Sequence, residues 1–116
     1  MRVLVVDDER AICEVVSAAL ADEGHEVVTA AHGAAALDLI GEAPPDLILL
    51  DMRMPVMDGW QFAAAYRRLP GPSAPIICMT AAPDAPARAQ DIRAAGYLGK
   101  PFDLDDLLSV VDRFAT

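Results

Sequence analysis

Short apolar runs alternate with longer segments of helical period along this chain, an order that few folds accommodate. Five runs have the length of strands, at residues 3–6, 26–30, 47–50, 76–79 and 97–98. Continuously apolar strands are typical of a parallel sheet whose two faces are covered by crossover helices. The 116 residues are enough for one domain with a real core. We therefore expect an α/β fold built on five parallel strands.

The segments between the runs carry the apolar stripes of amphipathic helices. Helices are expected before Gly24, over residues 34–40, after an N-cap at Asp58, around residues 87–95 and after an N-cap at Asp103. The side chains expected to face inward are Ile12, Val15, Val16, Ala19 and Leu20 in the first helix, Phe62, Tyr66 and Leu69 in the third, and Leu104, Leu107, Leu108, Val111 and Phe114 in the last. Five strand–helix units with right-handed crossovers predict a doubly wound, flavodoxin-like (βα)5 sheet of strand order 2-1-3-4-5 over residues 1–116.

Composition excludes several classes of function. The formal net charge is −9 and no cluster of Lys and Arg is present, so binding to nucleic acid is not expected. No apolar run approaches the ~20 residues of a membrane-spanning helix. The sequence reads straight into a strand without a signal peptide, so we expect a cytoplasmic protein with no membrane role. Cys13 and Cys78 lie in apolar segments and are interpreted as buried structural thiols.

Polar residues follow four of the five runs. Asp7-Asp8-Glu9 follow the first run, and Asp51, Thr80 and Lys100 follow the third, fourth and fifth. Ligands of doubly wound sheets bind beyond the carboxyl ends of the strands, where the strand order reverses, which here lies between the first and third strands. The acids should therefore meet at this edge, with the hydroxyl and the ammonium beside them.

This set of residues favours phosphoryl chemistry. Three carboxylates packed together repel one another unless a cation neutralises them, and an all-oxygen cluster without His or Cys suits Mg²⁺. Lys100 is the only lysine beside eight arginines, and its compact charge suits one phosphate oxygen, while Thr80 offers a hydroxyl to another. Asp51 is the expected nucleophile, because a carboxylate can form an acyl phosphate.

Four stretches together resemble the receiver domain of two-component response regulators over essentially the whole chain. They are Asp7-Asp8-Glu9, residues 45–59 (PDLILLDMRMPVMDG), Thr80-Ala81 and Lys100-Pro101-Phe102. The resemblance implies a signalling switch that catalyses its own phosphorylation and dephosphorylation but is not a turnover enzyme. It also implies a sensor histidine kinase or a histidine phosphotransfer protein as donor and a downstream protein target that the sequence does not name. The helix faces show no convincing dimer stripe, so monomer or weak dimer stays open.

The resemblance also implies residue roles. Asp51 would be the phosphoacceptor, and Asp8 and Asp51 would ligate Mg²⁺ with the backbone carbonyl of Arg53, while Asp7 would support the ion through water. Thr80 would turn toward the phosphoryl group and Lys100 would pair with it. Tyr97 would be the aromatic residue that swings inward as Thr80 moves, and Pro101 would follow a cis peptide bond.

Two departures from the family pattern carry expectations of their own. The interval from Thr80 to Lys100 is about two residues shorter than is common in the family, and it contains Pro83 and Pro86, which should delay or weaken the fourth helix. We expect this part of the usual signalling face to be mobile or reshaped. Arg53 and Ala82 occupy positions that tune the lifetime of the acyl phosphate in the family, and their opposing effects leave that lifetime unpredicted.

Three other functions would place some of the same residues at the edge of the sheet. A haloacid-dehalogenase-like phosphohydrolase would need a second Asp where Arg53 stands. A flavin-binding module would have its phosphate loop after the first strand, where Asp7-Asp8-Glu9 would repel the phosphate. A degenerate receiver that binds partners without phosphorylation is disfavoured by the complete set of site residues. The domain would act either alone or as part of a longer chain.

Overall fold

The computed structural model describes residues 1–115, so Thr116, the last residue of the expected domain, lies outside the described residues. The strands are β1 (Arg2–Val6), β2 (Glu26–Ala30), β3 (Leu47–Asp51), β4 (Ile76–Ala81) and β5 (Gly96–Lys100). The helices are α1 (Arg10–Asp22), α2 (Gly33–Glu42), α3 (Gly59–Arg68), α4 (Ala85–Asp91) and α5 (Leu104–Asp112), with a 3₁₀ turn, η1, at Ala82–Asp84.

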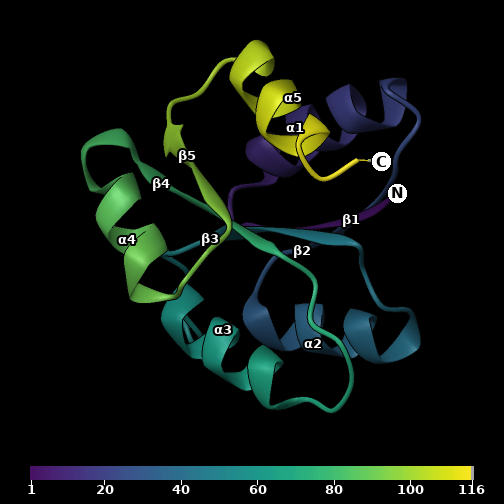
Figure 1. Cartoon of the computed structure of the whole chain (residues 1–116), viewed down its shortest axis with the longest axis vertical. Helices are drawn as coiled ribbons and strands as arrows, with labels where there is room; N and C mark the ends of the chain where they lie inside the picture. The colour runs from purple at the N-terminus through teal and green to yellow at the C-terminus, as the bar shows by residue number, and fades with distance from the viewer. Residues whose placement is uncertain (116) are drawn as a thin grey trace.

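The five strands form one parallel sheet of order β2-β1-β3-β4-β5, which confirms the predicted flavodoxin-like topology. Figure 1 shows α1 and α5 together on one side of the sheet and α2 and α3 on the other, with α4 beside β4 and β5. Because the order reverses between β1 and β3, the two strands that carry the acids at their ends are neighbours. No helix among residues 1–115 is long and apolar enough to span a membrane.

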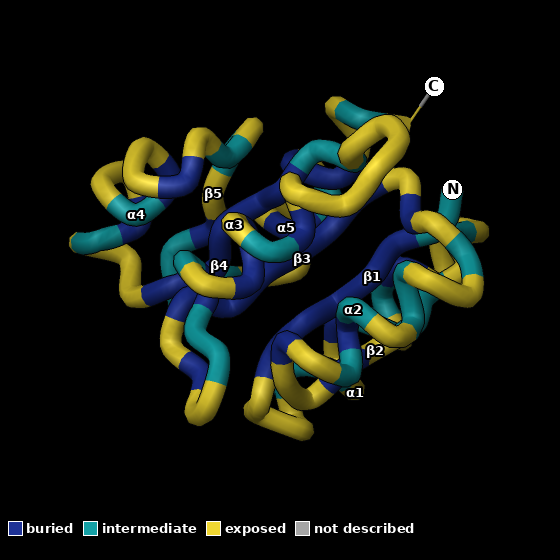
Figure 2. Tube along the Cα trace, turned by 90° about the horizontal axis from the view of Figure 1, so that it is seen from below, coloured by how far each residue is buried: buried dark blue, intermediate teal, exposed yellow. Residues whose placement is uncertain are grey.

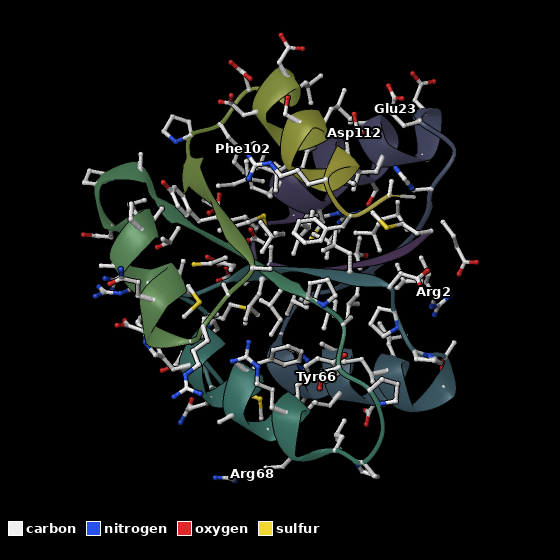
Figure 3. All side chains as sticks on the ribbon, in the orientation of Figure 1. Arg2, Glu23, Tyr66, Arg68, Phe102 and Asp112 are labelled. Atoms are coloured by element: carbon white, nitrogen blue, oxygen red, sulfur yellow. The ribbon has the colours of Figure 1, made fainter. Side chains whose placement is uncertain are left out.

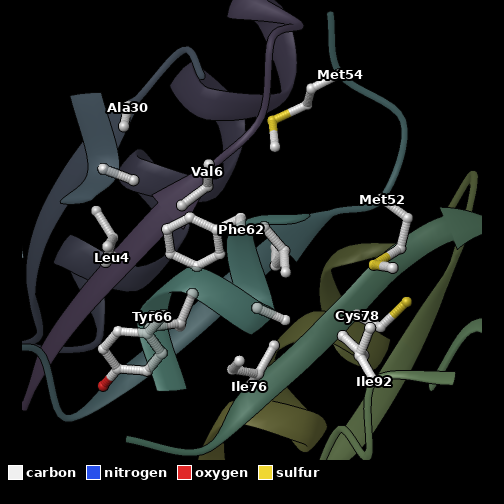
Figure 4. Close-up of a cluster of buried hydrophobic side chains, with 14 of the residues drawn as sticks. Leu4, Val6, Ala30, Met52, Met54, Phe62, Tyr66, Ile76, Cys78 and Ile92 are labelled. Carbon is white, nitrogen blue, oxygen red and sulfur yellow. The ribbon is translucent and has the colours of Figure 1, made fainter. Parts of the chain in front are cut away.

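Successive strand residues point to opposite faces, so the sheet has a separate core on each side. One core, under α2, α3 and α4, contains Phe62 and Tyr66, whose rings stack with centroids 5.9 Å apart (Figure 4). The other core, under α1 and α5, contains Leu20 and Leu107. Figure 2 shows the central strands β1, β3 and β4 mostly buried, while the edge strands β2 and β5 are partly exposed, and every residue of β3 is buried. The strand that ends in Asp51 is thus buried along its whole length.

Three expected core residues are exposed instead. Val15 is 53% exposed, since it lies beside the stripe of Val16 and Leu20 that contacts the sheet. Leu69 caps the C-terminus of α3 in an extended conformation and turns to solvent. Leu104 begins α5 and is 49% exposed, and the inner face of that helix is formed by Leu107, Val110 and Val111. An apolar stripe predicts which face of a helix turns toward the core. The residues at the edge of that face are buried only where a neighbouring helix or strand covers them.

The two cysteines differ. Cys78 is buried as predicted, and burial, followed by the charge of Asp51, raises the pKa of its thiol to about 12. Cys13 is only partly buried, and its Sγ donates a hydrogen bond to the backbone oxygen of Asp7 over 3.3 Å. Both thiols are free, and the prediction that both are buried is right for Cys78 and wrong for Cys13.

The fourth helix begins earlier than predicted. The turn η1 leads directly into α4, and Pro83 and Pro86 occupy the first turns of these two elements. A proline fits there because the first amides of a helix have no intrahelical acceptor, so neither proline delays the helix. The helix has seven residues, and the prediction that this face is reshaped relative to the family stays a prediction.

Polar side chains attach this short helix to α3. The indole Nε1 of Trp60 donates to Asp91 over 3.1 Å, and Arg88 donates to the same carboxylate over 2.8 Å while its guanidinium lies over the Trp60 ring. Arg67 donates to the carbonyl oxygens of Ile92 and Arg93 just beyond α4. These contacts hold the C-terminal half of α4 against α3. The position of the N-terminal end of α4 depends on η1, which leads directly into it.

Mobility of residues 82–90 stays a prediction. We expect their amides to exchange with solvent far faster than those of β3 and β4, because a short, proline-containing segment opens locally at low cost. Native-state hydrogen exchange checks this at single-residue resolution. Protection comparable with that of the central strands would contradict it.

Candidate functional site

The strand ends bring the predicted polar residues together. Asp7 follows β1, Asp51 is the last residue of β3, Thr80 lies near the end of β4, and Lys100 ends β5. Asp7, Asp51 and Thr80 are the buried polar residues of the described chain, at 1%, 4% and 2% exposure. Buried polar groups are costly unless they have partners, so their gathering at one edge marks this edge as the candidate site.

Three carboxylates form the centre of the site. One oxygen from each of Asp7, Asp8 and Asp51 lies within 4.8 Å of the others, with Asp8 exposed and the other two buried. Asp7 Oδ1 accepts a hydrogen bond from the amide of Glu9 over 2.9 Å, and Asp51 Oδ1 accepts a long one from the amide of Arg53 over 3.4 Å. These bonds hold the carboxylates in place without neutralising them.

The crowded and buried position of Asp51 raises the pKa of its carboxyl group. Burial and then the charge of Asp7 raise its pKa from 3.8 to about 6, against the opposing effects of Lys100 and of the Arg53 amide. A carboxyl with a raised pKa holds its proton more tightly than usual, which is the response expected of a buried acid beside another carboxylate that one lysine only partly offsets. The donor set is all oxygen and partly open to water through Asp8, so it suits a hard divalent ion such as Mg²⁺.

Lys100 is the cation that faces this cluster. Its Nζ lies 2.7 Å from Asp7 Oδ2, 3.3 Å from Glu9 Oε1 and 3.5 Å from Asp51 Oδ1. Burial lowers the pKa of the ammonium, but the hydrogen bond that Lys100 donates to Asp7 and the surrounding acidic charges outweigh burial and leave the pKa raised. The lysine therefore stays charged and is shared among three carboxylates, with Asp7 as its nearest partner.

Thr80 and Arg53 lie beside this centre, whereas Tyr97 lies apart from it, against α4. Thr80 is buried and pairs in register with Gly99 of β5, and Tyr97 lies in the same strand with 48% of its surface exposed. The Lys100–Pro101 peptide bond is cis, as the resemblance implies. The backbone amide of Arg53 donates to Asp51.

Gly59 is a site residue that the sequence reasoning did not single out. It begins α3, and its amide donates to the carbonyl of Met52 over 3.0 Å. A Cβ at Gly59 would lie 2.7 Å from the Cα of Met52 and 3.1 Å from the carbonyl oxygen of Asp51. Only a residue without a side chain lets the helix start this close to the end of β3, so Gly59 helps to fix the backbone that carries Asp51. A glycine immediately after the expected Asp58 cap was the available signal.

An apolar groove of about 800 Å³ opens beside the carboxylates, between α1 and the start of α5. Its walls include Ile12, Val15, Phe102 and Leu104, and its floor includes Asp51 and Lys100. Figure 3 shows Phe102 on the connection that leads from β5 to α5. The exposure of Val15 and Leu104 thus has a local reason, because both border this groove.

Cation binding should depend on pH, because protons compete for Asp51. Its raised pKa predicts that Mg²⁺ affinity is nearly constant above about pH 7 and falls as the pH drops through about 6. Titration calorimetry with Mg²⁺ between pH 5 and 8 measures this. Affinity that is unchanged down to pH 5 would show that Asp51 takes no part in binding the ion.

Comparisons with known proteins identify the relatives of this chain. The family model described as the response regulator receiver domain matches residues 3–112. The chain is 40% identical over 114 residues to the regulatory protein AtoC of Escherichia coli K12, covering 97% of this chain and 24% of AtoC. It is 40% identical over 111 residues to the response regulator MprA of Mycobacterium avium, covering 94% of this chain and 48% of MprA. The chain thus spans about half or less of the length of these relatives.

Solved structures agree with the sequence relatives. The chemotaxis protein CheY4 of Vibrio cholerae superimposes with a TM-score of 0.84 at 37% identity, over 97% of both chains. The receiver domain of NtrX from Brucella abortus superimposes with a TM-score of 0.87 at 32% identity, over 97% of this chain and 96% of that domain.

Proposed function

Because the chain belongs to the response regulator receiver domain family of two-component systems, we propose that it accepts a phosphoryl group on Asp51 and signals through the resulting change of shape. Receiver domains are signalling modules and not turnover enzymes. The observation that carries the proposal is the buried Asp51 carboxylate, which lies within 4.8 Å of two further acids and 3.5 Å from the Lys100 ammonium.

The residues of the site suit the binding of Mg²⁺. Asp8 and Asp51 would ligate the ion, with the carbonyl of Arg53 as a third protein ligand and Asp7 in support through water. The raised pKa of Asp51 supports this assignment, since burial and then repulsion by Asp7 disfavour its charge, and a bound cation would offset both effects. When bound, the ion would supply positive charge between the carboxylates and the oxygens of an incoming phosphoryl group.

Phosphoryl transfer would proceed from a phosphohistidine of a sensor kinase or a histidine phosphotransfer protein. An oxygen of Asp51 would form the new bond to phosphorus as the donor's phosphorus–nitrogen bond breaks, and the donor ring, already protonated on its other nitrogen, would keep the electron pair of the broken bond and leave as neutral imidazole. Lys100 would pair with one phosphoryl oxygen and Thr80 would donate its hydroxyl to another. The groove beside Asp51, bordered by Val15 and Leu104, supports a protein donor that approaches over α1 and α5.

The signal would then be the movement of Thr80 toward the phosphoryl group, with Tyr97 following from its half-exposed position in β5. The downstream target would be a protein. A degenerate receiver that works without phosphorylation is not favoured, since the acids, the hydroxyl and the lysine are all present at one edge.

The proposal is tested with Mg²⁺ and beryllofluoride, which imitates a phosphoryl group on a carboxylate. We expect saturable binding that needs both components and shifts the NMR resonances of Thr80, Ala81 and Tyr97. Asp8→Asn should weaken it at least tenfold through loss of a metal ligand. The absence of any shift in the wild-type domain at saturating Mg²⁺ and beryllofluoride would refute the proposal.

A further inference from the structure

Gly99 of β5 lies directly against the backbone that follows β4. A Cβ at this position would lie 2.7 Å from the Cα of Ala82 and 2.7 Å from its Cβ. Carbon atoms in contact are normally about 3.5–4.0 Å apart. The Cα of Ala82 belongs to the backbone and cannot rotate away, so only glycine at position 99 permits Ala82 to lie where it does.

The strand order shows in which direction Ala82 would have to move to leave Gly99. β4 lies between β3 and β5, with Asp51 paired to Met79 on one side and Gly99 paired to Thr80 on the other. Asp51 and Gly99 therefore flank the end of β4 from opposite sides. A shift of the residues after Thr80 toward Asp51 carries Ala82 away from Gly99, and a shift back restores the contact.

We propose that Gly99 is a positioning residue that stabilises the resting position of the connection after β4, an inference that rests on the proposed function. Thr80 is drawn toward the phosphoryl group on Asp51, and Ala82, two residues later, leaves Gly99 as it follows. The contact between Gly99 and Ala82 belongs to the unphosphorylated state and opposes the switched one. A side chain at position 99 removes the resting position and leaves the carboxylates untouched, so it shifts the equilibrium toward the switched state.

The variant Gly99→Ala tests this direction. We expect it to bind beryllofluoride in the presence of Mg²⁺ about fivefold or more tightly than the wild type, a typical size for such coupling. Its affinity for Mg²⁺ alone should be unchanged, because Asp7, Asp8 and Asp51 do not move. Adding Ala82→Gly removes one of the two contacting atoms and should return the affinity part of the way to the wild-type value.

A matched control exists in the same strand. A Cβ at Gly96 would meet only the Cδ1 of Ile77, at 3.1 Å, which is the far end of a flexible side chain. Gly96→Ala should therefore leave beryllofluoride affinity unchanged. A folded Gly99→Ala variant with wild-type or weaker affinity, or an equal gain in Gly96→Ala, overturns the inference.

The wild-type domain gives a second test that does not depend on any variant folding. A nuclear Overhauser contact between the Ala82 methyl group and the Gly99 Hα protons is expected in the free domain and should disappear with Mg²⁺ and beryllofluoride. Its persistence in the loaded domain contradicts the inference while the proposed function stands. A wild-type domain that binds no beryllofluoride refutes the proposed function itself.

Discussion

Replacement of Asp51 by asparagine is expected to abolish phosphorylation and, without metal, to stabilise the fold at pH 8. The amide cannot form an acyl phosphate, and it carries no charge to repel Asp7. The pKa of Asp51 rises from 3.8 to about 6 in the folded chain, so the carboxyl favours folding only when protonated. That contribution is complete below about pH 3.8 and is lost as the pH rises through about 6.

The size of the stabilisation follows from the same shift. Each pKa unit corresponds to about 1.4 kcal/mol, so Asp51→Asn should raise the free energy of unfolding at pH 8 by up to about 3 kcal/mol. Urea denaturation without metal and with Mg²⁺ measures the effect. Mg²⁺ should stabilise the wild type and leave the variant nearly unchanged.

Asp8→Asn is the matched control, because Asp8 is the exposed member of the cluster and its removal should stabilise the metal-free fold less. If Asp51→Asn were no more stable than the wild type at pH 8, burial and the neighbouring carboxylate would not penalise the charge of Asp51 as the geometry indicates.

Replacement of Lys100 has the opposite effect on stability. Lys100→Met leaves the fully buried side chain of Asp7 without the ammonium that lies 2.7 Å from it. Removal of one partner of a buried ion pair typically costs about 3–5 kcal/mol, and the partly exposed lysine places this pair at the lower end. We expect the free energy of unfolding of the metal-free domain to fall by about 3 kcal/mol, with Mg²⁺ restoring part of the loss.

Lys100→Arg separates charge from shape. The guanidinium keeps the positive charge beside Asp7, so the fold should retain most of its stability, but its planar, bulkier head does not reproduce the compact contact that one phosphoryl oxygen needs. Beryllofluoride should bind weakly and shift Thr80 and Tyr97 little in NMR spectra. Wild-type switching in Lys100→Arg would refute the role given to the single lysine.

The architecture was accessible from the sequence because its determinants are local. The apolar runs and helical stripes predicted every strand and the strand order, and the position of Asp51 at the end of the run LILL predicted its place at the sheet edge. The Asp58 cap was also predictable, and the structure completes it as a capping box with Gln61. Once the strand order is known, polar residues that follow buried strands have few places to lie other than the edge of the sheet.

The features of the structure that the sequence did not predict depend on distances between separate helices, strands and loops. The pairing of Glu9 with Lys100, the approach of Gly59 to Met52 and that of Gly99 to Ala82 each join segments whose spacing no periodicity encodes. The exposure of Val15 follows from a groove that only the packed helices create. The predicted start of α4 is too late because a proline interrupts a helix only beyond its first turn, and Pro83 and Pro86 occupy first-turn positions.

Intact-mass measurement after incubation with Mg²⁺ and acetyl phosphate tests the central claim most directly. The wild-type domain should gain the mass of one phosphoryl group, the gain should require the metal, and peptide mapping should assign it to Asp51. Asp51→Asn should gain nothing under the same conditions. A wild-type domain whose mass stays unchanged, or a variant that is modified equally, would contradict the assignment of Asp51 as the phosphoacceptor.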